Sequence, residues 1–416
     1  MPVQKMDVFD VIVSGAGPAG ATTALFLARA GKKVLLLDKE KFPRDKICAD
    51  NKTWKCLDIV KELGLWKQFQ KLPKAEIYGV LVASPNGSEM YTPLHEKDIA
   101  ERGHWYNVKR IHFDNLLAQA AKKEKNITFK EKCAVVKPIY AVHSKTHISG
   151  VTYHDAKGKT HDAWARVVVG ADGSQSPIAK AVGHSPVVKG RYATNTRAYF
   201  ENVKGPMDRC ELYYLKGICP GYFWIFPVDK KTCNVGIGMR PEDFERQKKS
   251  LEQILRETIA LPQFKGRFKK AKQVTAFKEW GLSVLGKRRP CAGNGWVLVG
   301  DAGTFAMTFS GEGVGPSMRT GKIAAQGIVR ALNENDVSAR NLKKHYEDAL
   351  WKILNPEVKG FRWLEFLLLN ERLFDFVIAK SAKNKELIEI SSRMQHDYTL
   401  SKKLVHPKTA LKMLLS

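Results

Sequence analysis

Three glycines near the N-terminus have the types and spacing of a dinucleotide-binding turn. Residues 11–13 are Val-Ile-Val, and Gly15, Gly17 and Gly20 follow in the pattern Gly-x-Gly-x-x-Gly. Between a strand and a helix, the first glycine permits the tight turn, the second lets the backbone approach a pyrophosphate, and the third lets helix and strand pack closely. The free N–H groups at the start of such a helix bind phosphate, so the segment predicts a phosphate site.

An acidic residue follows at the distance that this kind of site requires. The apolar run 34–37 ends at Asp38, roughly 20 residues beyond the glycines, where an acid can accept a hydrogen bond from a ribose hydroxyl. The order strand, glycine turn, helix, strand, acid therefore predicts a site for the ADP part of FAD or NAD. The glycines do not distinguish between these two cofactors.

Three later segments favour FAD. Residues 167–176 read as a buried strand that runs into a turn rich in Gly, Asp and Ser, and residues 296–303 read as a strand that ends in a Gly-Asp turn. Residues 310–315 are Ser-Gly-Glu-Gly-Val-Gly before a helical pattern that starts near Pro316. We expect Asp301 to hydrogen-bond the ribityl chain of a flavin. We expect Gly311 and Gly313 to bring backbone N–H groups close to the ligand.

The loop after the second strand carries two residues that could take part in chemistry. It reads Phe-Pro-Arg-Asp-Lys-Ile-Cys-Ala-Asp over residues 42–50, and its cations would face the flavin or its phosphates. A thiol at Cys48 that lies near Lys46 can be activated by the neighbouring positive charge. The alternative is an ordinary turn with a buried, inert cysteine.

Aromatic residues alternate along a predicted strand at Tyr222, Trp224 and Phe226, and Pro227 follows them. Alternate residues of a strand point to one face, so these rings would form an apolar wall suited to a hydrocarbon chain or a ring. A Gly-Ile-Gly segment follows at 236–238. The alternative is a strand whose aromatic face fills a core.

Length, net charge and cysteine content limit the domain number, the partners and the metal sites that the chain can have. The chain has 416 residues, enough for two or three domains, and a net charge of +27. That charge attracts polyanions, but no nucleic-acid motif accompanies it, so we expect an anionic membrane surface and no nucleic acid as the partner. The tail 400–416 combines lysines with leucines, which suits an amphipathic segment that lies on a bilayer; the alternative is a solvated lysine-rich tail. The seven cysteines form no C-x-x-C pair, so we expect no metal.

The order of strands and helices predicts an α/β fold with a Rossmann-type FAD-binding domain, an antiparallel β substrate domain and a helical C-terminal region. We expect the FAD-binding domain to be discontinuous, with a helix from Arg110 to about Lys123. Its expected segments are residues 1–75, 105–189 and 285–330. The substrate-binding platform is expected from 76–104 and 190–284, the latter as alternating strands, and the helical region from 331–416.

Five motifs occur in one order, and together they resemble the geranylgeranyl reductase family of FAD enzymes, within the superfamily that includes glutathione reductase and the aromatic hydroxylases. They are PRDKICA at 43–49, R-x-x-x-D-x-x-L at 110–117, GADGSxS at 170–176, YxWxFP at 222–227 with its following GxG, and GDAG at 300–303 with SGEG at 310–313. The chain departs from the family pattern at Ala49, where the family usually has glycine, and in the bulky residues 50–54. It also carries Thr308 and Phe309 where many archaeal members have a proline-containing turn.

The resemblance implies an FAD-dependent reductase that saturates double bonds of an isoprenoid lipid or a prenyl diphosphate. It implies that Tyr222, Trp224, Phe226 and Pro227 line the isoprenoid channel. The residues that it implies in contact with FAD are Ala19, Asp38, Cys48, Ala49, Arg110, Ala134, Asp301, Gly313 and Val314.

The sequence leaves several alternatives open. An isolated alkene accepts hydride poorly, so a proton must be supplied on the other face, and its donor could be the flavin, Cys48 or an ordered water. Lys46 and Cys48 are the candidate catalytic residues. The electron donor could be NAD(P)H or a ferredoxin. The rival functions are an oxygen-using monooxygenase or halogenase of the same fold, and a flavoprotein that binds lipid without turnover. We expect a cytoplasmic protein in peripheral contact with the membrane.

Overall fold

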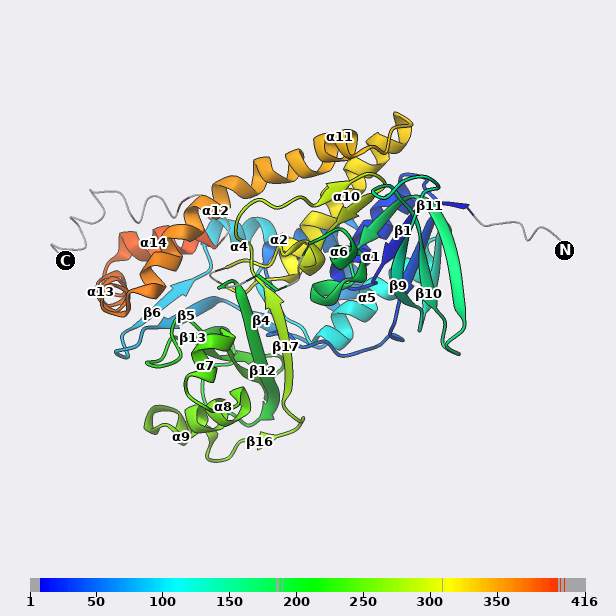
Figure 1. Cartoon of the computed structure of the whole chain (residues 1–416). Helices are drawn as coiled ribbons and strands as arrows, with labels where there is room; N and C mark the ends of the chain where they lie inside the picture. The colour runs from blue at the N-terminus through cyan, green and yellow to red at the C-terminus, as the bar shows by residue number, and fades with distance from the viewer. Residues whose placement is uncertain are drawn as a thin grey trace.

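The computed structural model describes residues 8–184, 187–188, 190–308, 310–395, 397 and 400. Two large sheets lie side by side, and a long helix runs along both of them (Figure 1). The first sheet lies at the right of the view, the second lies below the centre, and the C-terminal helices form the left end. The predicted fold class is confirmed, with the expected FAD-binding sheet, a mainly antiparallel second sheet and a helical C-terminal region.

The first sheet has the strand order β18-β19-β11-β1-β2-β8, and β9 and β10 extend it beside β11. Strands β1, β2, β8, β11 and β19 are parallel, so their carboxyl ends meet at one edge. In open parallel sheets this edge holds the ligand. The bounds are β1 (Val8–Ser14), β2 (Val34–Asp38), β8 (Ile127–Glu131), β9 (Ala134–Tyr140), β10 (Ile148–His154), β11 (Thr160–Gly170), β18 (Ala292–Gly293) and β19 (Trp296–Leu298).

Helices cover this sheet and its ligand edge. The predicted helix from Arg110 to about Lys123 is present with those bounds, and the helix predicted from Pro316 begins at Val314. The helices that precede the C-terminal region here are α1 (Pro18–Arg29), α2 (Trp54–Glu62), α3 (Trp66–Gln70), α4 (Glu96–Arg102), α5 (Arg110–Lys123), α6 (Pro177–Ala181) and α10 (Val314–Asn333). A small sheet in the order β3-β7-β4 joins β3 (Asn51–Lys52), β7 (Trp105–Asn107) and β4 (Ala75–Ile77).

The second sheet has the order β16-β12-β15-β14-β13-β5-β6, and β17 also pairs with β12. Its strand pairs are antiparallel except for the parallel pair of β13 with β5. The bounds are β5 (Gly79–Ala83), β6 (Glu89–Pro93), β12 (Tyr192–Glu201), β13 (Arg209–Tyr213), β14 (Tyr222–Pro227), β15 (Thr232–Met239), β16 (Lys272–Gln273) and β17 (Lys278–Ser283). The three-domain division of the chain stays a prediction.

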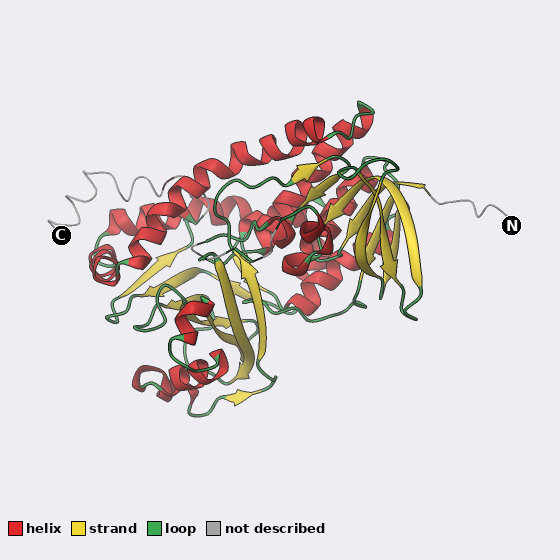
Figure 2. Cartoon of the chain, in the orientation of Figure 1, coloured by secondary structure: helices red, strands yellow, loops and turns green. Residues whose placement is uncertain are grey.

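The expectation of strands throughout 190–284 is wrong for its middle part. Helices α7 (Pro241–Glu245), α8 (Leu251–Ala260) and α9 (Pro262–Phe268) occupy it (Figure 2). Ser250 and Gln253 form a capping box at the start of α8, and prolines begin the other two helices. Helix α8 buries Leu251, Ile254, Leu255 and Thr258 against the second sheet, a helical spacing that the sequence does contain.

The C-terminal region is helical as expected, with α11 (Ala339–Leu342), a π-helical turn (Lys343–Glu347), α12 (Asp348–Leu369), α13 (Glu371–Ser381) and α14 (Lys385–Met394). The amphipathic tail predicted at 400–416 lies outside the described residues from 401 onward. Among the helices that the structure describes, none combines the length and apolar character needed to cross a bilayer.

Helices α1 and α10 pack closely because a glycine lies at their contact. A Cβ on Gly321 would lie 2.5 Å from the Ala19 carbonyl oxygen and 2.8 Å from the Thr23 hydroxyl. Both helices begin at the ligand edge of the first sheet, so this contact fixes the distance between their N-termini.

We predict that Gly321→Ala lowers the stability of the protein by about 1–3 kcal/mol, because the added methyl group pushes α10 away from α1. The measurement is denaturant unfolding followed by circular dichroism. Gly266→Ala is the control, since Gly266 is exposed in α9 and a Cβ there meets nothing within 4 Å. The control should gain about 0.5–1 kcal/mol from helix propensity. Similar gains for both variants would show that the α1–α10 contact is not tight.

Candidate active site

The glycine turn after β1 has the geometry that a dinucleotide site requires. Gly15 has φ +98°, and a Cβ on it would lie 2.6 Å from the Ala171 carbonyl oxygen. A Cβ on Gly20 would lie 1.8 Å from the Gly15 carbonyl oxygen. A Cβ on Gly17 would meet only an Arg44 guanidinium nitrogen, at 3.6 Å. Gly15 and Gly20 are therefore required by packing, whereas the space beside Gly17 is open to a ligand.

Two helix N-termini face the same cavity. Gly17 is the N-cap of α1 and Gly313 is the N-cap of α10, and neither helix start has a side-chain cap. Ala19, Gly311, Gly313 and Val314 all line the cavity wall. The first N–H groups of both helices are therefore directed to the cavity, where α1 can bind phosphate and α10 can bind a polar edge of the cofactor.

Asp38 and Asp301 lie on the wall at the ends of β2 and β19. The Asp38 carboxylate accepts hydrogen bonds from the backbone N–H of Ala16 at 2.7 Å and of Glu40 at 2.8 Å, which fixes its orientation. Burial raises the pKa of Asp38 and the pKa of Asp301. The Asp301 side chain is half-buried and lines the cavity, so its carboxylate can accept a hydrogen bond from a ligand there, as a ribityl hydroxyl would provide.

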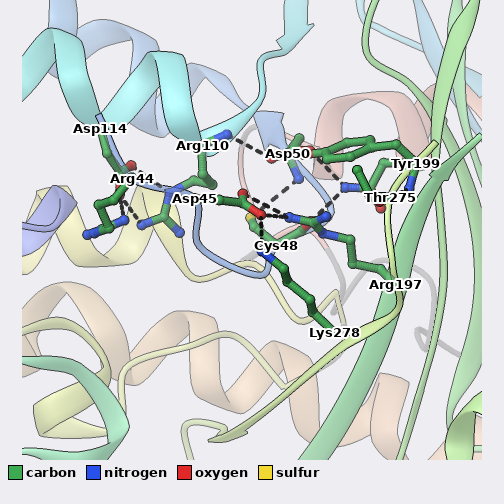
Figure 3. Close-up of polar contacts among 11 residues, drawn as sticks. Arg44, Asp45, Cys48, Asp50, Arg110, Asp114, Arg197, Tyr199, Thr275 and Lys278 are labelled. Carbon is green, nitrogen blue, oxygen red and sulfur yellow. Dashed lines mark hydrogen bonds and ion pairs between the residues drawn. The ribbon is translucent and has the colours of Figure 1, made fainter. Parts of the chain in front are cut away.

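Arginines hold the cation-rich loop 39–50 against α5 (Figure 3). The Arg110 guanidinium donates to the Asp114 carboxylate at 2.6 and 2.7 Å, and Arg44 donates to it at 2.6 Å. Burial would raise the pKa of Asp114, but the two guanidinium groups hold it below its ordinary value. The R-x-x-x-D motif thus makes an ion pair within one helix that also receives the loop arginine.

Asp50 connects this loop to the second sheet (Figure 3). It has φ +73° and is fully buried. Its carboxylate accepts hydrogen bonds from the Arg110 backbone N–H at 3.1 Å, from the Tyr199 hydroxyl at 2.6 Å and from the Asn234 side-chain amide at 2.8 Å. A second link between the loop and this sheet is made by Asp45. Its carboxylate accepts hydrogen bonds from the Arg197 guanidinium on β12 at 2.9 Å.

Lys46 and Cys48 both lie on the cavity wall, in different surroundings. The Lys46 ammonium lies 2.9 Å from the centroid of the Trp280 ring. Burial lowers the pKa of Lys46 to about 7, although the Asp301 carboxylate opposes this effect. The Cys48 sulfur accepts a hydrogen bond from the Asp50 N–H at 3.3 Å and interacts with the Arg110 guanidinium.

The aromatic residues of β14 point to the cavity, and the glycines of β15 give them room. Tyr222, Trp224 and Phe226 line the cavity, whereas Phe223 and Ile225 point to the core under α8. Trp224 pairs with Gly236 across the strands, and a Cβ on Gly236 would lie 2.2 Å from the indole ring. The indole therefore lies flat on β15, and its N–H donates to Asn234 at 2.9 Å.

One cavity of about 930 Å³ contains most of the residues predicted for the site. Gly20 and Pro227 are not on its wall: Gly20 packs against the turn, and the Pro227 carbonyl accepts a hydrogen bond from Asn107. The predicted residues that line the cavity are Gly15, Gly17, Ala19, Asp38, Lys46, Cys48, Ala49, Arg110, Ala134, Tyr222, Trp224, Phe226, Asp301, Gly311, Gly313 and Val314.

Sequence reasoning missed the far end of the cavity, which is apolar. It is built by β5, β6 and β13 of the second sheet and by the three C-terminal helices. Its residues are Val80, Val82, Met90, Leu212, Leu364, Leu367, Leu368, Phe374, Val377, Ile378 and Met394. The sequence of these helices shows apolar residues at helical spacing, but it does not show which of them face a cavity and which fill the core.

These features define a class of protein, an oxidoreductase with a dinucleotide site that opens into an apolar cavity. Residues 8–341 match the model of the FAD binding domain family, and the chain belongs to that family. FAD is therefore its cofactor, as the sequence predicted, and the free space at Gly17, the two open helix starts and Asp301 fit it.

Named relatives narrow the class. The chain is 28% identical over 413 residues to digeranylgeranylglycerophospholipid reductase 1 of Methanothermobacter thermautotrophicus, with 97% of each chain covered. The crystal structure of a geranylgeranyl bacteriochlorophyll reductase-like protein from Thermoplasma acidophilum has a TM-score of 0.81 at 22% identity and covers 96% of this chain and 99% of that one. A flavin-dependent brominase has a TM-score of 0.78 at 20% identity, with 98% and 99% covered. The chain is thus an FAD-dependent oxidoreductase similar to geranylgeranyl reductases, which confirms the predicted resemblance.

We predict that Gly17→Val yields a folded protein without flavin. The protein leaves room for the valine side chain, so the chain can fold. That side chain occupies the space in which a pyrophosphate would lie against the backbone of Gly17. The measurement is visible flavin absorbance per mole of protein, with circular dichroism as the test of folding. Gly20→Val is the contrasting variant and should fail to fold, because its Cβ would overlap the Gly15 carbonyl. Full flavin content in Gly17→Val would exclude this turn as the cofactor site.

We predict that Lys46 in the flavin-depleted protein reacts with acetic anhydride at neutral pH. Its ammonium group loses its proton as the pH rises through about 7, so its labelling should level off above that pH. An ordinary lysine has a pKa of about 10.4, and its labelling should still increase there. Peptide mass spectrometry across pH measures both, with the exposed Lys157 as the reference. The same pH profile for both lysines would contradict the lowered pKa.

Proposed function

We propose that the enzyme saturates carbon–carbon double bonds of an isoprenoid chain carried by a lipid or a prenyl diphosphate. The observation that carries this proposal is the continuity of one cavity from Gly17 and Asp301, past Trp224, to an apolar end at Phe374 and Ile378. A polar cofactor and a hydrocarbon chain can therefore occupy the same cavity and meet at the aromatic wall. The name of the methanogen relative supports the same substrate class.

The apolar end is suited to a hydrocarbon chain because aliphatic side chains from two directions form it. The second sheet contributes Val80, Val82 and Met90, and the C-terminal helices contribute Leu367 and Ile378 among others. Each CH₂ group that leaves water for such a surface stabilises binding by roughly 0.8 kcal/mol. A branched chain gains this energy without needing polar partners, so recognition can rest on the chain rather than on a head group.

The residues of the site align the alkene and exclude water, and FAD supplies the hydride when it is bound and reduced. Protonation of a trisubstituted alkene places positive charge on the branched carbon. The faces of Tyr222 and Trp224 stabilise such a charge by about 0.5–2 kcal/mol. The hydrogen bond to Asn234 and the flat contact with Gly236 hold the Trp224 ring in one orientation for this purpose.

We assign proton delivery to the Cys48 thiol. It lines the same cavity as Tyr222, and its backbone carbonyl accepts a hydrogen bond from Asn234 at 2.7 Å, which fixes the loop against the aromatic wall. The proton passes from sulfur to one alkene carbon, and the thiolate that remains lies against the Arg110 guanidinium. Lys46 lies on the Asp301 side of the cavity and is placed to interact with the cofactor.

The proposed function is tested with reduced enzyme and geranylgeranyl-bearing lipids in detergent. Each saturated bond adds two hydrogens, which mass spectrometry detects, and lipids of cells with and without the gene should show the same difference. NAD(P)H and a reduced ferredoxin are supplied separately to identify the electron donor. If the reduced enzyme instead consumes oxygen and halogenates or hydroxylates an aromatic compound, and leaves isoprenoids unchanged, the rival function is correct.

We predict that Trp224→Ala lowers isoprenoid turnover by at least about tenfold with unchanged flavin content, since positioning and charge stabilisation are both lost. Phe223→Leu is the matched control, because Phe223 lies on the same strand but points away from the cavity. The control should lose stability and keep its turnover per bound flavin. Wild-type turnover by Trp224→Ala would show that the aromatic wall has no role in the reaction.

A further inference from the structure

The end of α12 and the start of α13 expose large apolar side chains to solvent. Phe366 and Leu369 of α12 are 50% and 65% exposed, and Phe376 of α13 is 36% exposed. Only Asn370 separates the two helices, so these residues lie around one corner of the molecule, at the left end of Figure 1. We call this set the α12–α13 corner. Groups of exposed apolar side chains mark surfaces that meet another molecule.

The corner lies at an opening of the cavity. Leu369 is largely exposed and also lines the cavity, so the cavity reaches the surface at this residue. Leu364, Leu367 and Leu368 of the same helical turns line the cavity from inside. The leucines of α12 therefore form a mainly apolar route from the outer surface to the apolar end of the cavity, with Glu365 as the charged residue of the same turns.

Basic side chains surround the corner. Arg362 lies four residues before Phe366 and shares its stripe of α12, and Arg372 lies four residues before Phe376 on α13. The Lys380 ammonium lies 6.0 Å from the Phe376 ring centroid. At the corner itself the exposed charged residues are the cations Arg362 and Arg372. The acids there are half-buried: Glu365 pairs with Arg191 at 2.7 Å, and Asp375 accepts a hydrogen bond from the Asn86 backbone N–H at 3.0 Å.

From these observations we propose that the α12–α13 corner docks on a bilayer that carries anionic head groups. Phe366, Leu369 and Phe376 enter the interface, the arginines contact the head groups, and the isoprenoid chain passes from the bilayer into the cavity at Leu369. This inference rests on the proposed function, because it needs a substrate that resides in a membrane. The cations of the corner favour an anionic bilayer as the partner over an uncharged apolar surface. Segments that lie at membrane interfaces combine exposed rings with cations in the same way.

The test is sedimentation of the full-length flavin-loaded protein with phosphatidylglycerol vesicles and with phosphatidylcholine vesicles. The wild type should bind the anionic vesicles more tightly, and 1 M salt should weaken that binding because the screening length falls to about 3 Å. Phe366→Ser/Phe376→Ser should lower the partition coefficient by at least about tenfold. Arg362→Glu/Arg372→Glu should lower it by about fivefold or more for each residue.

Matched controls lie at the other end of the molecule. Val142 is 85% exposed and follows β9, and Lys157 is exposed in the turn after β10. Val142→Ser and Lys157→Glu should bind vesicles as the wild type does. Flavin content should be unchanged in all variants, because none of the substituted residues lines the cavity.

Turnover of a detergent-dispersed isoprenoid separates this inference from the proposed function. If the wild type does not reduce that substrate, the proposed function is wrong, whatever the vesicles show. If the wild type reduces it but the corner variants still bind vesicles like the wild type, the docking inference is overturned. Loss of a dimer in the corner variants with unchanged vesicle binding also overturns it, because the corner would then be a contact between two copies.

Discussion

The buried carboxylate of Asp50 is the interaction on which the arrangement of the site depends. A carboxylate without water must be satisfied by protein donors, and here they come from three separate parts of the fold: α5, β12 and β15. The backbone of Asp50 is left-handed, a conformation that persists in a residue with a side chain only where the surroundings enforce it. Because Cys48 lies two residues earlier, the same bonds that satisfy Asp50 fix the thiol against the aromatic wall.

Asn234 extends this constraint to the substrate side. Its amide nitrogen donates to the Cys48 carbonyl and to Asp50, while its amide oxygen accepts from the Trp224 indole. One side chain thus sets the distance between the cofactor loop and the ring that lies in the cavity. Gly236 completes the arrangement, since any side chain there would displace the indole from β15. The spacing between the aromatic motif and the Gly-x-Gly motif along the chain places Trp224 opposite Gly236 when β14 and β15 pair.

The sequence predicted those parts of the site that depend on local spacing. Gly15, Gly17, Asp38 and Asp301 each end or follow a strand of one parallel sheet, so their convergence follows from the topology. The partners of Asp50 could not be predicted, because Tyr199 and Asn234 lie 149 and 184 residues away along the chain. Local periodicity likewise predicted helices after residue 331, but it could not show which of their faces would close a cavity.

Helix α12 connects the cofactor side of the molecule with its outer corner. Near its middle, Glu357 accepts hydrogen bonds from Arg319 of α10 at 2.8 and 2.7 Å and from Lys55 of α2 at 3.5 Å. Burial would raise the pKa of Glu357, but these cations hold it below its ordinary value, so the carboxylate stays charged. Helix α10 begins at the cofactor site, and α12 ends at Leu369, where the cavity opens. An ion pair in the middle of α12 therefore fixes the opening of the cavity relative to the cofactor site.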